Sequence, residues 1–295
     1  MLQVSSKDRL LLGSWIVSLA LLAIATLFGI AWQQNITLTY SQKKADLVST
    51  MRIELLKSLA AEKNAVIAAR AETARSFAAQ SREAAEALER SQKQYAAIPQ
   101  AEKSSPEHQA YQEFNTCWSQ LRLLNAELLG LAVQNTNIQA QQLSSHESAQ
   151  ALASFEVALS GQLRAEASPA VSFHAQQALI AALKIQTLHM PHILSQQDTE
   201  MDALEARMQT DDRSVHQHLA ALDSTMAHKT PSRARDDYQR FMALTGQILK
   251  LSRQNTNVHS AELELGKTQL VSTQCQENLA QLQAIIQGQE FRATR

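Results

Sequence analysis

The sequence predicts an all-α protein: an N-terminal transmembrane helix followed by an elongated antiparallel up-down-up-down four-helix bundle. The first reason is that only 7 Gly and 5 Pro occur among 295 residues, too few for the turns of a sandwich, barrel or α/β enzyme. The second is that helix formers such as Ala, Leu, Gln and Glu dominate the chain. The third is that three Ser-Pro or Thr-Pro pairs recur at almost equal spacing.

Residues 10–32 contain no charged side chain, and this length suffices for a helix to cross a hydrocarbon core of about 30 Å. Lys7 and Arg9 precede the segment and only Asp8 opposes them. The positive-inside rule then predicts that residues 1–9 are cytoplasmic and that residues 33–295 lie in the periplasm of a bacterial inner-membrane, single-pass protein. A cleaved signal peptide ending near Ala25 is the alternative.

The prolines divide residues 33–295 into four predicted helices. Pro placed directly after Ser or Thr is typical of the first helical position, and such starts occur at Pro106, Pro169 and Pro231. Pro99 ends the helix before the first of them, and Pro191 predicts a kink. The predicted helices cover about 34–98, 106–165, 169–228 and 231–290.

An internal repeat relates the second and fourth helices. Gln134-Asn135-Thr136-Asn137 recurs as Gln254-Asn255-Thr256-Asn257, and apolar residues around both copies alternate in steps of three and four, as in a coiled coil. A shared change of phase after each copy predicts a stammer. The bundle is therefore interpreted as a duplicated helical hairpin.

Asn135 and Asn255 fall on the apolar seam. They are interpreted either as a polar layer that fixes the helix register or as part of a ligand-binding cavity. Cys117 and Cys275 also lie on the seam. In an up-down-up-down bundle the second and fourth helices run parallel, so the two sulfurs are expected about 50 Å apart. The sequence therefore predicts two buried free thiols and no disulfide.

A membrane helix, an antiparallel bundle and the segment from Tyr238 to Asn257 together resemble the four-helix-bundle sensor domain of methyl-accepting chemotaxis receptors and related sensor kinases. In size the soluble part is closer to the helical bimodular version, with two bundles. The resemblance implies chemotaxis-type signal transduction by helix displacement. It also implies a second membrane helix, a HAMP linker and an output domain, none of which occurs in these 295 residues. The sequence is therefore interpreted either as the sensory part of a longer receptor or as a protein that acts through a partner.

Two further groups are candidate sites. Arginines on the first helix grip carboxylate ligands in receptors of this type, and Arg52, Arg70 and Arg75 are the residues considered for that role, with solvated charges as the alternative. His189 and His192 are considered as soft-metal ligands, with capping or solvated histidines as the alternative.

The near-neutral balance of 27 Lys+Arg and 28 Asp+Glu excludes a nucleic-acid partner, and the absence of phosphate-loop, GxSxG, HExxH and CxxC motifs predicts no enzyme and no cofactor. The sequence predicts a sensory, ligand-binding module anchored in the lipid bilayer by residues 10–32. An Ala-rich first helix buries little area, which favours a homodimer. The alternative is a structural or adaptor subunit that docks on another membrane complex.

Overall fold

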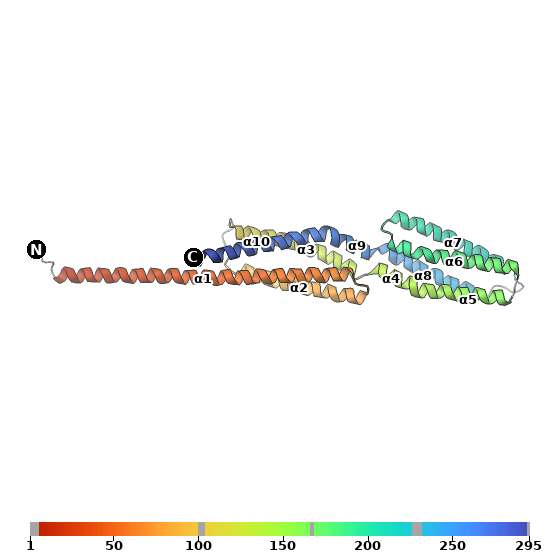
Figure 1. Cartoon of the computed structure of the whole chain (residues 1–295), viewed down its shortest axis with the longest axis horizontal. Helices are drawn as coiled ribbons and strands as arrows, with labels where there is room; N and C mark the ends of the chain where they lie inside the picture. The colour runs from red at the N-terminus through yellow and green to blue at the C-terminus, as the bar shows by residue number, and fades with distance from the viewer. Residues whose placement is uncertain (1–5, 100–103, 166–167, 226–231, 294–295) are drawn as a thin grey trace. The chain divides into compact units, whose positions relative to one another are not determined.

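The computed structural model describes residues 6–99, 104–165, 168–225 and 232–293, and all regular structure in these ranges is helical (Figure 1). This confirms the all-α class. The side chains of most residues from 6 to 38 are outside the described set, so the predicted membrane segment 10–32 falls mainly outside it. Among the described residues, no helix combines the length and apolarity needed to cross a membrane.

The described elements are ten α-helices and two short π-helical segments, η1 and η2. In chain order they are α1 (Ser6–Val66), α2 (Ala71–Ala97), α3 (Pro106–Ala132), α4 (Thr136–Leu143), η1 (Ser144–Ser148), α5 (Ala149–Ala165), α6 (Pro169–Leu194), α7 (Asp198–Thr225), α8 (Ser232–Gln254), α9 (Thr256–Leu263), η2 (Glu264–Thr268) and α10 (Gln269–Ala293).

Two of the predicted helix starts carry the expected caps. The Ser105 hydroxyl accepts from the backbone N–H of His108 at 3.2 Å, and Ser168 accepts from that of Val171 at 3.2 Å. Each of these bonds satisfies one of the N–H groups that a helix start leaves free. The third predicted start, at Pro231, lies outside the described residues.

Each of the four predicted 60-residue helices is interrupted. The segment predicted as 34–98 is divided into α1 and α2, and 169–228 is divided into α6 and α7, which pack against each other. Pro191 is three residues from the end of α6, so the helix stops at Leu194 soon after the position where a kink was predicted. The segments 106–165 and 231–290 are interrupted at Asn135 and Asn255.

The chain forms two compact units. Unit 1 consists of Met1–Ala60, Gln80–Arg122 and Leu270–Arg295, and unit 2 of Ala61–Ala79 and Leu123–Gln269. Each unit has its own large apolar core. The core of unit 1 comes from α1, α2, α3 and α10, and that of unit 2 from α5, α6, α7 and α8. The structure thus contains two helical bundles in place of the single elongated bundle that the proline spacing predicted, and this number agrees with the helical bimodular version that the size of the chain resembles.

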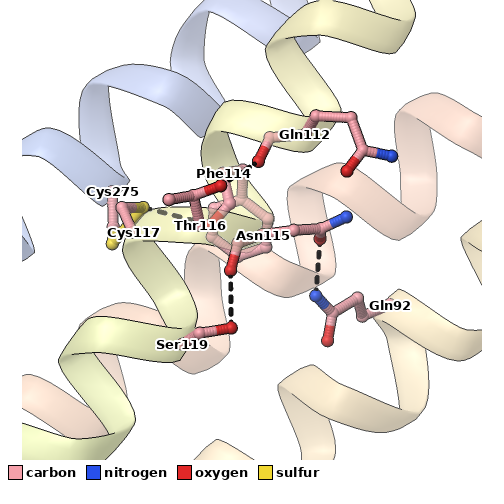
Figure 2. The surroundings of a disulfide bond; sticks show 8 residues. All are labelled: Gln92, Gln112, Phe114, Asn115, Thr116, Cys117, Ser119 and Cys275. Atoms are coloured by element: carbon pink, nitrogen blue, oxygen red, sulfur yellow. Dashed lines mark hydrogen bonds between the residues drawn. A yellow bond between two sulfur atoms is a disulfide. The ribbon is translucent and has the colours of Figure 1, made fainter. Parts of the chain in front are cut away.

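A disulfide joins Cys117 of α3 to Cys275 of α10 in the core of unit 1, with 5.6 Å between the Cα atoms (Figure 2). The prediction of two free thiols was therefore wrong. The sequence did not predict the chain reversal between α6 and α7. Because of this additional reversal, α3 and α10 run antiparallel. Beside the disulfide, the Gln92 side chain donates to Asn115 Oδ1 at 2.6 Å and links α2 to α3.

Candidate functional site

The two copies of the repeated motif meet in unit 2, at the start of α4 and of α9. Asn135 has φ 52° and ψ 40°, and Asn255 has φ 51° and ψ 31°. They are the only non-glycine residues with positive φ in the described part of the chain. Asn tolerates the left-handed conformation better than most other side chains do, so the motif allows one helix to stop and the next to start within one to three residues. We call this region the Asn junction; it comprises residues 135–137 and 255–257.

The two restarted helices cap each other. Neither junction Asn caps its own helix. Instead, the backbone N–H of Thr136 donates to Thr256 Oγ1 at 3.1 Å, and that of Thr256 donates to Thr136 Oγ1 at 3.3 Å. The next pair repeats the arrangement, with the N–H of Asn137 and Asn257 donating to each other's side-chain oxygen at 3.1 and 3.2 Å. Free N–H groups at both helix starts are thereby satisfied reciprocally.

The asparagine amides connect the junction to the two nearby chain reversals. Asn135 Nδ2 donates to the carbonyl of Ala68, between α1 and α2, at 3.4 Å, and Asn255 Nδ2 donates to that of Ser195, between α6 and α7, at 3.1 Å. Asn137 Nδ2 donates to Asn255 Oδ1 at 2.7 Å. Asn135 and Asn255 are 1% and 4% exposed, so a movement of either reversal changes hydrogen bonds that have no nearby solvent to replace them.

His189 is the centre of a buried polar layer beside the Asn junction, which we call the His189 layer (Ser144, Ser148, His189 and Thr245). Its Nδ1 is 3.1 Å from the Ser144 hydroxyl on η1, and its Nε2 is 3.1 Å from the Thr245 hydroxyl on α8. Burial, followed by the proximity of His192, lowers the pKa of His189 to about 4. The imidazole is therefore neutral near neutral pH, and both of its nitrogens have partners.

His192 connects α6 to α7 and α8. Its Nδ1 is 2.8 Å from Ser252 Oγ and its Nε2 is 2.9 Å from Glu205 Oε1. Arg253 Nε donates to the same Glu205 oxygen at 2.8 Å, and this bond, aided by His192, keeps the pKa of Glu205 below its ordinary value.

Ser252, His192 and Glu205 have the composition of a catalytic triad, but not its accessibility. Ser252 is 0% exposed and donates its hydroxyl hydrogen to the His192 carbonyl at 2.9 Å. A nucleophilic Ser needs its proton directed at the base and its oxygen open to substrate. We therefore interpret the three residues as a helix-to-helix link.

The three candidate arginines make no contact with the Asn junction that the structure records, and the two candidate histidines are buried. Arg52 is an exposed residue of unit 1 that donates to Gln283. Arg70 and Arg75 are exposed in unit 2, where Arg75 lies 3.8 Å from Glu72. His189 and His192 are both fully buried, so they are not solvated, and all four ring nitrogens face hydroxyls or a carboxylate.

Sequence reasoning missed the reciprocal roles of Thr136, Thr256, Asn137 and Asn257, although all four lie inside the repeat it identified. It also interpreted the phase change after each motif as an overwinding stammer, whereas the structure has the π-helical segments η1 and η2, which are underwound. Glu62 was missed too, despite the clear signal of an acidic residue on the seam of an apolar helix.

A solved structure shares this fold. The sensor domain of the histidine kinase sensor TorS from V. parahaemolyticus superposes with a TM-score of 0.59 at 11% sequence identity, over 82% of this chain and 98% of that one. Neither the protein-family models nor the curated proteins contain a match to this chain. At this identity the likeness establishes a helical fold that a sensor domain also uses.

Proposed function

We propose that this chain is a membrane-anchored, periplasmic sensory module that transmits a signal by rearranging helices at the Asn junction. The observation that carries the proposal is the reciprocal capping of α4 and α9 at two positive-φ asparagines. Transmission of a signal requires an element with two alternative packings. Because α4 and α9 each supply the capping group of the other, the two helices are able to shift together.

Two observations support an extracytoplasmic location. The Cys117–Cys275 disulfide belongs to the class of bonds that persist in oxidising compartments such as the periplasm. The uncharged segment 10–32 is long enough for a membrane anchor. The fold shared with the TorS sensor domain supports a sensory role, and we extend the proposal to a homodimer that pairs with a signalling partner in the membrane.

Hydrogen–deuterium exchange on the full chain in detergent tests the role of the Asn junction. A panel of small amines, carboxylates and sugars is first screened by thermal shift. A compound that stabilises the protein should change the exchange of the amides of residues 135–137 and 255–257, while amides beside the disulfide of unit 1 serve as the control. A screen without any stabilising compound, or stabilisation without a change at the junction, contradicts the proposal. Purification with a stoichiometric foreign protein and no ligand response supports the adaptor alternative.

A further inference from the structure

A second polar layer in unit 2 contains buried oxygens without hydrogen-bond partners. We call it the Glu62 layer (Glu62, Asn125, Glu264 and Thr268). Among the described residues, six buried side-chain polar atoms have no partner, and five of them belong to this layer: both carboxylate oxygens of Glu62, Asn125 Oδ1, Glu264 Oε2 and Thr268 Oγ1. Buried polar groups normally have hydrogen-bond partners, so a cluster of five unpaired oxygens requires an explanation.

Contacts and chain geometry place three members of the layer together. The carboxyls of Glu62 and Glu264 are neighbours, and burial, followed by the interaction with the Glu264 carboxyl, raises the pKa of Glu62 far above its ordinary value. Glu264 and Thr268 begin and end η2, so they lie one turn apart on the same segment. These three residues are 0%, 8% and 1% exposed.

The internal repeat places Asn125 in the same layer. The Asn junction pairs residues 120 positions apart, and the same offset relates Asn125 to Thr245, Glu264 to Ser144 and Thr268 to Ser148. A second offset relates the chain reversals. The junction asparagines donate to the carbonyls of Ala68 and Ser195, which are 127 positions apart. The same offset of 127 positions relates Glu62 to His189. The Glu62 layer is thus the counterpart of the His189 layer, in which Thr245 faces His189 at 3.1 Å. From this correspondence we infer that Asn125, which is 2% exposed, belongs to the same layer as Glu62.

The two layers differ in how their polar groups are satisfied. In the His189 layer, a neutral imidazole with one donor and one acceptor nitrogen is matched to two hydroxyls. In the Glu62 layer, the same positions hold two carboxylates, an amide oxygen and a hydroxyl. Ionised carboxylates and amide oxygens only accept hydrogen bonds, so four of the five unpaired atoms are acceptors and the Thr268 hydroxyl is the single donor among them.

A hard cation satisfies several oxygens at once. Calcium takes six to eight oxygen ligands in a flexible geometry, whereas magnesium requires a near-ideal octahedron and retains most of its water. Five protein oxygens with water completing the shell suit calcium, and a divalent ion neutralises both carboxylates. Glu264, whose other oxygen lies 3.8 Å from the exposed Lys63 ammonium, connects the layer to solvent.

We propose that the Glu62 layer is a binding site for a hard divalent cation of calcium size, ligated by Glu62, Glu264, Asn125 and Thr268. The site joins α1, α3 and η2, and Glu264 lies about two turns after the Asn junction, so occupancy would fix the register of these segments.

Calorimetric titration of the full chain with calcium chloride, after treatment with a chelator, tests the proposal. We expect one ion per chain and a rise in Tm with calcium concentration. Glu62→Gln and Glu264→Gln conserve side-chain size and should each weaken binding at least tenfold. Glu262→Gln is the matched control, because Glu262 lies two residues from Glu264 and is 59% exposed.

Three outcomes would overturn the proposal. The absence of calcium binding to the wild-type protein at millimolar concentration would leave the layer without a cation. Equal binding by wild-type protein and Glu62→Gln would place the ion elsewhere. Tighter binding of magnesium than of calcium would contradict the predicted size. Since the wild-type titration stands without any variant, the proposal is testable even if a substitution impairs folding, and none of these results bears on the sensory role.

Discussion

Reduction of the Cys117–Cys275 disulfide should lower the free energy of unfolding by several kcal/mol. The bond joins residues 158 positions apart, and the chain-entropy relation gives about 5 kcal/mol for a loop of this length when the whole chain unfolds together. If unit 1 unfolds while the contacts between Thr136 and Thr256 still hold, the flexible loop is about 40 residues long and the same relation gives about 4 kcal/mol. Both estimates exceed the effect of most single substitutions.

Urea unfolding followed by circular dichroism measures this difference on the full chain in detergent, with and without dithiothreitol. The double variant Cys117→Ala/Cys275→Ala is the matched control. It should unfold like the reduced wild type and should not respond to the reductant. Two titratable thiols in the denatured, unreduced protein, or equal unfolding midpoints for the oxidised and reduced forms, would refute the reasoning.

Three further predictions concern single side chains. Asn255→Ala should cost about 2–3 kcal/mol, since it adds left-handed strain to the loss of hydrogen bonds, and Asn255→Gly should cost about 1 kcal/mol less; equal thermal stabilities would contradict this. Burial lowers the pKa of His189 to about 4, so stability should be complete above about pH 6.5 and decline by up to about 3 kcal/mol as pH falls to about 4; urea midpoints across this range should show a slope that His189→Gln flattens. Glu107 forms a buried 2.6 Å ion pair with Lys44, and Glu107→Ala should destabilise by about 3–5 kcal/mol in thermal unfolding, whereas the exposed Glu113→Ala should change stability by less than about 0.5 kcal/mol.

Local sequence signals predicted two of the helix starts correctly but did not predict two of the chain reversals. Ser105 and Ser168 cap helices where the Ser-Pro pairs indicated, because capping depends on residues within one turn. The reversal after Val66 has no such signal, since Ile67-Ala68-Ala69-Arg70 contains neither Gly nor Pro. Its partner lies far away in the chain, where Asn135 donates to the Ala68 carbonyl. The missed reversal between α6 and α7 caused the error about the disulfide, because it changed the relative direction of α3 and α10.

The candidate site was predicted in part. The repeat identified both junction asparagines, and their position on the seam suggested a polar layer. That they break their helices was also inferable, since Asn is one of the few residues that readily takes positive φ. The reciprocal capping was not inferable, because it depends on two helix starts meeting with antiparallel register. The proximity of the Glu62 and Glu264 carboxyls was likewise not predictable, because it depends on the fold placing η2 beside α1.

The Asn junction has the form of a symmetric dimer interface enclosed within one polypeptide, since each side offers the other the same residues at an offset of 120 positions. In a true homodimer every substitution appears on both sides at once. Here each side is encoded separately, so its surroundings have been free to diverge, towards neutral imidazole chemistry around His189 and towards acid around Glu62. The duplicated chain thus combines a symmetric hydrogen-bond arrangement at the Asn junction with two chemically different polar layers. A substitution in one layer leaves the residues of the other layer unchanged.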